Sequence, residues 1–352
     1  MKVLIIATGG TISQIANEDG ILESNETSRS GSDFMRILES KKETLGIESI
    51  SAKTIMNKDS ANMVMEDWQC IVRAVVDNYD HYDAFIVTHG TETMGYASSA
   101  VSFALGRLGK PVAFTGAQSS FGAPGSDSIM NLENTLRVLS LRRDLVGVFL
   151  VFGTNIVSGT RVKKKTEFDY DAFKCSRRFR PLGIVGSDIM FNEESIKRHN
   201  SYHKPSAKNA NELVVINKFS NKIVALSEFP GMESSVFINM AKSGVKGFVL
   251  RSHGSGVPNV GKESAEFENL RPAFEYLQQN KIPLVLTSQA PDGVACMNIY
   301  EPSFIARELG AIPTHDMTIE AAVAKLSWLL GQDKSYDQIH KMFPKSLRGE
   351  IH

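Results

Sequence analysis

Apolar runs alternate along the chain with longer stretches of helical periodicity. In the first half, runs bounded by Gly, Pro or Asn predict buried strands at residues 3–7, 84–88, 112–115 and 146–152. Apolar positions three and four residues apart predict helices between them, at residues 66–79, 98–108 and 129–139. This alternation is typical of βα repeats around a largely parallel sheet.

A second set of α/β elements follows a polar stretch. From about residue 192 to residue 211 the chain reads NEESIKRHNSYHKPSAKNAN, with a proline and no periodicity, so we expect an inter-domain connection near its end. Beyond it, the pattern predicts strands at 223–226, 247–251 and 284–287, and helices at 235–243, 267–279 and 318–330. We therefore expect a larger N-terminal domain with a mostly parallel, flavodoxin- or Rossmann-like sheet (1–205), a linker (206–221) and a smaller C-terminal α/β domain (222–352).

The composition indicates a globular protein without a global charge. Of the 352 residues, 42% are hydrophobic, which is ample for two buried cores. Lys plus Arg and Asp plus Glu number 39 each, so no net field attracts nucleic acid or an anionic membrane. The basic clusters at 163–165 and 177–180 are typical of solvated surface. We expect a small-molecule ligand, and neither nucleic acid nor a membrane as a partner.

The cysteines indicate reduced thiols. Cys70, Cys175 and Cys296 are widely spaced and are not paired with histidines at metal-ligand spacing, so we expect no disulfide and no metal. The N-terminus lacks the pattern of a secretory signal, and no run of about 18 or more apolar residues occurs. We therefore expect a cytoplasmic protein.

Two glycine–threonine loops directly follow predicted strands. They read ATGGTI (7–12) and VTHGTETMG (87–95), and in each a glycine precedes a threonine. The backbone can turn sharply there and present N–H groups while a hydroxyl projects into the crevice that open α/β sheets use for ligands. Either loop alone is compatible with an ordinary turn. A phosphate cradle is disfavoured, because neither loop has the GxGxxG spacing or the P-loop lysine.

Further motifs accompany these loops in a fixed order: DSANM (59–63), TGAQ (115–118), GSDSIMNL (125–132) and GTRVKK (159–164). Together the set resembles the bacterial-type L-asparaginase family, most closely its cytoplasmic type I branch, over nearly the whole chain. The family signatures TGGTI and HGTDT stand here at 8–12 and, as HGTET, at 89–93. LRSHG (250–254) and DMTIEA (316–321) correspond to the family's LRSYG and DMTVEA.

The resemblance implies an amidohydrolase that converts L-asparagine to L-aspartate and ammonia through a threonine nucleophile and a covalent acyl-enzyme, without a cofactor. Thr11 corresponds to the nucleophile, and Thr91, Glu92 and Lys164 correspond to a threonine, an acid and a lysine that work together. A threonine hydroxyl is a poor nucleophile until a base takes its proton, and its β-methyl group restricts the rotamer. A lysine can serve as such a base when burial disfavours its charge. Without the resemblance, three consecutive lysines would indicate an exposed basic loop.

The resemblance also implies how substrate is held. The loop that binds the α-carboxylate in the family corresponds to Asp59, Ser60 and Ala61, and the acid that binds the α-ammonium corresponds to Glu92. Thr91 is a further candidate for substrate binding. Backbone N–H groups at Gly10 and Gly90 are candidates for an oxyanion hole, which contributes roughly 3 to 4 kcal/mol per donor in comparable sites. The family also implies a homodimer or homotetramer in which a neighbouring subunit completes the crevice.

Four positions depart from the family pattern. The acid of HGTDT is here Glu92, one methylene longer, and a displacement of about 1 Å in a positioned group can cost on the order of 100-fold in rate. The lid tyrosine of type I enzymes is replaced by Ile21, a side chain of the DSxDM loop is missing at Ala61, and the asparagine of the GVGN motif is replaced by Val257. All four changes affect the grip on the amino-acid head group or the lid, whereas the two threonines and the lysine are retained.

These departures leave alternatives to an L-asparaginase. One is a hydrolase of a different small amide, such as L-glutamine or a modified or D-amino-acid amide, and another is a non-catalytic ligand-binding relative. The amidotransferase subunit that shares this fold usually carries an extra N-terminal domain, and TGGTI begins here at residue 8, which disfavours it. The type I allosteric site uses a cysteine that LTSQAPDG (286–293) lacks, so we do not predict effector binding.

Overall fold

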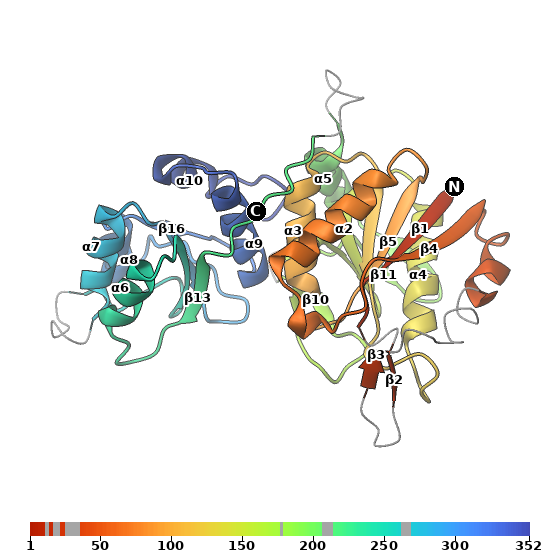
Figure 1. The fold of residues 1–352 in the computed structure, drawn as a ribbon, viewed down its shortest axis with the longest axis horizontal. Coiled ribbons are helices and arrows are strands. Elements are labelled where there is room, and N and C mark those ends of the chain that lie inside the picture. Colours follow the sequence, from red (N-terminus) through yellow and green to blue (C-terminus); the bar gives the residue numbers. More distant parts are fainter. Residues whose placement is uncertain (11–13, 17–21, 25–35, 177–178, 206–213, 262–268) are drawn as a thin grey trace. The chain divides into compact units, whose positions relative to one another are not determined.

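The computed structural model describes residues 1–10, 14–16, 22–24, 36–176, 179–205, 214–261 and 269–352. By its internal contacts the chain divides into two compact units, the first of which is Met1–Cys175 with Phe179–Asn217. The second consists mainly of Lys218–His352. The larger unit holds a mostly parallel sheet and the smaller one a separate parallel sheet (Figure 1), so the predicted two-domain α/β fold class is confirmed.

An eight-stranded sheet forms the centre of the first unit, in the order β12-β11-β8-β7-β6-β5-β1-β4. The neighbouring strands β7, β6, β5, β1 and β4 run parallel to one another. Strands β8, β11 and β12 pair antiparallel with their neighbours. The strands are β1 (Lys2–Ala7), β4 (Ser49–Thr54), β5 (Ala84–Thr88), β6 (Pro111–Thr115), β7 (Gly147–Phe152), β8 (Asn155–Ser158), β11 (Gly183–Val185) and β12 (Ile189–Phe191). Two small hairpins pair β2 (Gln14–Ala16) with β3 (Leu22–Ser24) and β9 (Val162–Lys164) with β10 (Phe173–Cys175). All four strands predicted for this domain are confirmed.

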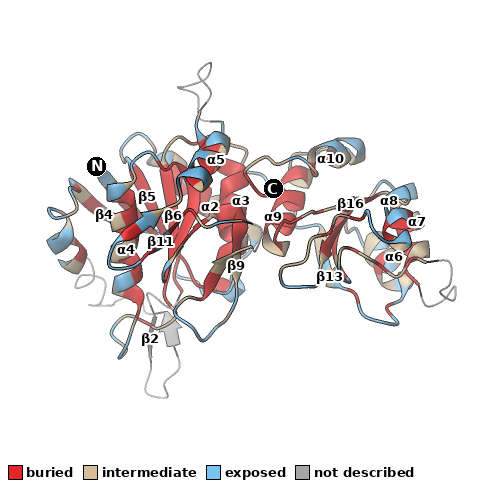
Figure 2. Ribbon diagram, turned by 180° about the vertical axis from the view of Figure 1, so that it is seen from behind, coloured by how far each residue is buried: buried red, intermediate tan, exposed pale blue. Residues whose placement is uncertain are grey.

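Helices cover both faces of this sheet. Two lie on one face, α2 (Met65–Asp77) and α3 (Met94–Leu105), and α4 (Ser128–Leu141) lies on the other (Figures 1 and 2). The three predicted helices are confirmed, although α3 begins four residues before the predicted 98–108, because it buries eleven of its twelve residues and so lacks a clear apolar stripe. Strands β5, β6 and β7 are neighbours in this order, with α3 connecting β5 to β6 and α4 connecting β6 to β7. Because α3 and α4 lie on opposite faces, one of these two crossovers is left-handed, against the usual right-handed rule.

The polar stretch, in which the sequence shows no periodicity, contains a helix that was not predicted. It is α5 (Glu193–His203), and the side chains it buries are Ile196, His199, Asn200 and His203. The ring of His199 hydrogen-bonds on both sides, to Ser158 Oγ at 3.0 Å and to the Val146 carbonyl at 2.8 Å. Burial lowers the pKa of His199 to about 4, so it is neutral at neutral pH. The buried face of α5 is mainly polar, and a search for apolar periodicity cannot detect it.

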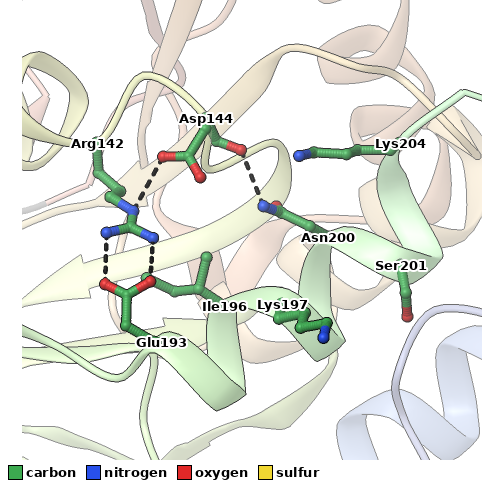
Figure 3. A pocket seen from close by; sticks show the side chains of 8 residues that line it. All are labelled: Arg142, Asp144, Glu193, Ile196, Lys197, Asn200, Ser201 and Lys204. Atoms are coloured by element: carbon green, nitrogen blue, oxygen red, sulfur yellow. Dashed lines mark hydrogen bonds and ion pairs between the residues drawn. The ribbon is translucent and has the colours of Figure 1, made fainter.

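The start of α5 is tied to the end of α4 by an arginine (Figure 3). The Arg142 guanidinium makes two hydrogen bonds to the Glu193 carboxylate, and its Nε lies 2.9 Å from Asp144 Oδ1. This bidentate partner lowers the pKa of the Glu193 carboxyl. Figure 3 also shows Asn200 reaching Asp144, whose backbone carbonyl accepts from the amide at 2.9 Å. Polar contacts therefore fix α5 where an apolar stripe would normally do so.

The second unit contains a four-stranded parallel sheet in the order β13-β14-β15-β16. Its strands are β13 (Ile223–Ser227), β14 (Gly247–Ser252), β15 (Leu284–Ser288) and β16 (Ala311–Pro313). Its helices are α6 (Ser234–Lys242), α7 (Arg271–Gln279), α8 (Glu301–Glu308), α9 (Ile319–Gly331) and α10 (Tyr336–Met342). The three predicted strands and the helices α6 and α9 are confirmed. The helix predicted at 267–279 is α7, and residues 267–268 of that range lie outside the described residues.

A buried ion pair connects α9 to the C-terminal residues. The side chains of Lys325 and Glu350 are both fully buried and in direct contact. The lysine also donates to the carbonyls of Phe343 at 2.8 Å and Lys345 at 2.6 Å. Burial lowers the pKa of Lys325, and the Glu350 carboxylate opposes that shift. The carboxylate and the two carbonyls therefore accept all three N–H donors of the buried Lys325 ammonium.

Removing one partner of this pair should destabilise the second unit. We expect Glu350→Gln to lower the free energy of unfolding by about 3 kcal/mol or more, because a buried ammonium then lacks its counter-charge. Urea unfolding of wild type and variant measures the difference. Glu308→Gln, at an exposed position on α8, is the control, with an expected effect within about 0.5 kcal/mol. Equal stability of both variants would contradict the assignment.

Candidate active site

The strand order brings the loops after β1 and β5 to one place. Strand β1 lies between β4 and β5 in the sheet. The next strand of this sheet along the chain, β4, pairs with one edge of β1, and the one after it, β5, pairs with the other edge, so the strand order reverses at β1. Ligands of open α/β sheets bind beyond the carboxyl ends of strands at such a switch point. Thr8 joins the two loops directly, since its N–H and its hydroxyl both donate to the Thr88 carbonyl, at 3.2 and 2.9 Å. Both predicted glycine–threonine loops therefore begin at this switch point.

The loops meet so closely here that three glycines are required. A Cβ on Gly10, whose φ is +84°, would lie 2.5 Å from the Cα of Gly90. A Cβ on Gly90 would in turn lie 2.5 Å from Ser60 Oγ. Gly9 is packed in the same way against the backbone of Lys58. The loops after β1, β4 and β5 are therefore in direct contact, and no side chain fits at any of these three glycines.

Three of the predicted catalytic residues come together at this point. Lys164 Nζ lies 2.9 Å from Thr91 Oγ1 and 2.7 Å from Glu92 Oε1. Thr91 is buried, the lysine side chain is 18% exposed, and the glutamate side chain is 59% exposed. The lysine comes from the β9–β10 hairpin, where it pairs with Phe173, whose ring packs edge-on against Phe152. The hairpin thus presents one lysine to the threonine from a firmly packed base.

The longer acid at position 92 does not break the contact with the lysine. Glu92 Oε1 reaches Lys164 Nζ at ordinary hydrogen-bond distance, and the Glu92 N–H donates to Ser60 Oγ at 3.2 Å. The exposed remainder of the Glu92 carboxylate faces solvent. This acid can therefore orient the lysine and still offer an oxygen to a cationic ligand group.

In the loop predicted to bind the α-carboxylate, Asp59 and Ser60 already make hydrogen bonds within the protein. Asp59 caps the short 3-10 turn η2 (Ser60–Asn62), because its Oδ1 accepts the Ala61 N–H at 2.8 Å. Ser60 is buried, and its carbonyl accepts the Thr93 hydroxyl at 2.7 Å. Ala61 is exposed. Ser60 therefore belongs to the same contact network as Thr91 and Glu92, which the sequence did not predict.

A neutral histidine lies directly beneath the second loop. His89 is fully buried, and its Nδ1 lies 2.7 Å from the Gly90 carbonyl. Since a carbonyl can only accept, Nδ1 carries the hydrogen. Burial lowers the pKa of His89 to about 4, against the smaller opposing effects of the Gly90 contact and Asp67. The histidine therefore braces the Gly90–Thr91 peptide without adding a charge.

Three positions singled out in the sequence add nothing to this geometry. Thr11 and Ile21 lie outside the described residues. Val257 lies in the second unit, where its N–H donates to the His253 carbonyl at 2.9 Å. Among the described residues, no group of three or more His, Cys, Asp or Glu side chains is arranged to hold a metal ion. Nor does any helix in that part of the chain have the length and apolar character needed to cross a bilayer.

Comparisons with known proteins extend this picture over the whole chain. A family model described as asparaginase, N-terminal, matches residues 2–197, and one described as glutaminase/asparaginase C-terminal domain matches residues 222–343. The chain belongs to the asparaginase family. The resemblance inferred from the sequence motifs is thereby confirmed.

The family relatives carry two kinds of name. The L-asparaginase of Thermococcus kodakarensis is 32% identical over 352 residues, spanning 100% of this chain and 99% of that protein. Its solved structure superposes with a TM-score of 0.82 at 29% identity, with the same coverage. L-asparaginase 1 of Escherichia coli is 34% identical over 83% of this chain and 82% of that protein. A subunit of the glutamyl-tRNA(Gln) amidotransferase of Pyrococcus abyssi is 30% identical over 99% of this chain and 76% of that protein.

The buried histidine of this asparaginase-family chain predicts a pH dependence of stability. Between pH 6.5 and pH 4 the unfolded chain binds a proton at His89 that the folded chain does not, so stability is lost as pH falls through this window. The loss from this residue is on the order of 3 kcal/mol. We expect His89→Asn to lose less stability than wild type between pH 7 and pH 4, as measured by urea unfolding. Exposed His81→Asn should retain the wild-type slope.

Proposed function

We propose that this chain is a threonine-dependent amidohydrolase that converts L-asparagine to L-aspartate and ammonia. The observation that carries the proposal is the contact of Lys164 Nζ with both Thr91 Oγ1 and Glu92 Oε1 at the switch point of the sheet. Hydrogen-bond reach between a hydroxyl and a candidate base is the first requirement for activating it. Membership of the asparaginase family, and relatives named L-asparaginase, support the choice of substrate.

Thr11 is the proposed nucleophile. Its oxygen attacks the side-chain amide carbon, its proton passes to the leaving nitrogen, and ammonia departs from an acyl-enzyme ester. Water then cleaves the ester, which releases L-aspartate and restores the hydroxyl. Backbone N–H groups at Gly10 and Gly90 are the proposed oxyanion donors, and the close approach of these two glycines supports their acting on one oxygen.

The Thr91–Lys164 pair is the proposed proton-transfer unit. Lys164 acts as a base toward Thr91, and Glu92 holds the ammonium that results. The exposed part of the Glu92 carboxylate binds the α-ammonium of the substrate, and Asp59, Ser60 and Ala61 form the wall beside the α-carboxylate. We further propose that the enzyme is cytoplasmic, needs no cofactor, and works as a homodimer or homotetramer whose neighbouring subunit completes the crevice.

Ammonia release from the purified protein tests this proposal. With L-asparagine, L-glutamine and D-asparagine assayed side by side, we expect L-asparagine to be turned over fastest. Thr11→Ala and Lys164→Met should each lower kcat by about 1000-fold or more, since members of one catalytic unit cost nearly the whole rate when removed. Lys165→Met, at the exposed neighbouring position, is the matched control and should stay within about two-fold of wild type.

The other possible results of this assay would each support one of the alternatives or refute the proposed base. Faster turnover of L-glutamine or D-asparagine would assign the alternative amide hydrolase. Binding of L-asparagine without turnover by wild type would assign a non-catalytic relative. Activity that survives in Lys164→Met would refute the proposed base.

We expect the activity to depend on the length of the acidic side chain at position 92. Glu92→Asp withdraws the carboxylate by one methylene from a lysine that it now meets at 2.7 Å, so we expect kcat/KM to fall by about ten-fold or more. Glu92→Gln keeps the length and removes the charge, and should chiefly raise KM for a substrate with an α-ammonium. Steady-state kinetics on L-asparagine measure both. Higher activity in Glu92→Asp would mean that the longer acid is itself a defect.

A further inference from the structure

Lys58 lies at the edge of the site and has a salt-bridge partner. Its Nζ is 2.6 Å from Asp67 Oδ2, and the two side chains are 36% and 15% exposed. Asp67 lies in the first turn of α2, and the same Oδ2 accepts the Val64 N–H at 2.8 Å. The pair therefore closes the segment between Lys58 and the start of α2 into a loop, which contains the whole of η2.

The backbone of Lys58 holds the opposite side of the site. Its N–H donates to the Thr8 carbonyl at 3.1 Å, and its backbone packs directly against Gly9, where a Cβ would not fit. Thr8 and Gly9 begin the loop that leads to the proposed nucleophile. One residue thus connects the loop after β1, through its backbone, with the start of α2, through its side chain.

Ser60 carries this attachment on to the proposed catalytic residues. Two positions after Lys58, its Oγ accepts the Glu92 N–H at 3.2 Å and its carbonyl accepts the Thr93 hydroxyl at 2.7 Å. It also touches Gly90 so closely that no Cβ fits between them. A displacement of Ser60 therefore either strikes the Gly90 backbone or releases the Glu92 N–H. The position of Ser60 and the position of residues 90–93 are mechanically linked.

We propose that Lys58 is a positioning residue of this site: paired with Asp67, it holds Ser60 against residues 90–93 and so sets Thr91 and Glu92 at their distances from Lys164. Its relevance to catalysis rests on the function proposed above. Exposed ion pairs usually contribute little to stability. Here the pair acts on geometry, because Asp67 Oδ2 holds both the Lys58 ammonium and the Val64 N–H. A shift of about 1 Å at a catalytic group can cost on the order of 100-fold.

The first test is a charge-removing variant with a matched control. Lys58→Met keeps most of the aliphatic side chain and removes the contact with Asp67. We expect kcat/KM for L-asparagine to fall by about ten-fold, whereas Lys53→Met, at an exposed position on β4, should stay within about two-fold of wild type. Lys58→Arg keeps the charge and should recover most of the activity. Unchanged activity in Lys58→Met would overturn the proposal.

A double-mutant cycle separates positioning from general destabilisation. If Lys58 acts through Ser60, the additional loss caused by Lys58→Met should disappear in a Ser60→Ala background. Salt provides a second readout, since screening at about 1 M should lower the activity of wild type more than that of Lys58→Met, which keeps the Glu92 contacts but has already lost the Lys58–Asp67 pair. Additive losses in the cycle, or an equal salt response in both proteins, would assign Lys58 a merely structural role.

Hydrogen exchange tests the inference independently of activity. The Glu92 N–H should exchange at least about ten-fold faster in Lys58→Met than in wild type, because its acceptor Ser60 Oγ is no longer held in place. A peptide from β7 serves as the internal control and should be unchanged. Faster exchange in Lys58→Met, together with a wild type that releases no ammonia, would refute the proposed function and keep this inference. Unchanged exchange would refute the inference alone.

Discussion

The closest approach in this site is between backbones. Gly10 and Gly90 leave no room for a Cβ between the loops after β1 and β5, and Gly90 also meets Ser60 from the loop after β4. The loops after β1 and β5 thus meet backbone to backbone, and the Ser60 side chain makes the contact from the loop after β4. This constraint fixes where hydroxyls and N–H groups can project, because each loop blocks the movement of the other two. The arrangement of Thr91, Glu92 and Lys164 depends on it.

The lysine reaches this centre from a different kind of element. It is 73 residues from Thr91 in sequence and stands on a three-residue strand of a hairpin outside the main sheet. The scaffold therefore separates two tasks. The parallel strands place the loops, and the hairpin supplies the lysine side chain from outside the main sheet. An insertion or deletion in the hairpin would move the lysine without disturbing the loops.

The sequence predicted the parts of the fold that show apolar runs or stripes. The strands β1, β5, β6 and β7 bury nearly every residue and were found, whereas β4 reads SISAKT, with one buried residue and an exposed end, and was missed. The loop of Asp59 and Ser60 follows β4, so its contacts with Glu92 and Thr93 could not be foreseen from periodicity. Thr91 and Glu92 were identified by their place after a strand and by the family motif. Lys164 was identified from the family resemblance alone, since neither its short strand nor its neighbouring lysines distinguish it.

The buried pair of Lys325 and Glu350 bears on the order in which the protein assembles during synthesis. The two residues are 25 positions apart, so at ~5–20 residues per second the lysine is made roughly one to five seconds before its counter-charge. During this interval α9 carries an ammonium that would be costly to bury unpaired. The helix therefore gains by staying hydrated until Glu350 has been made, so its docking onto the second sheet is delayed until then. An exposed, apolar α9 would be the segment most open to a chaperone in that interval.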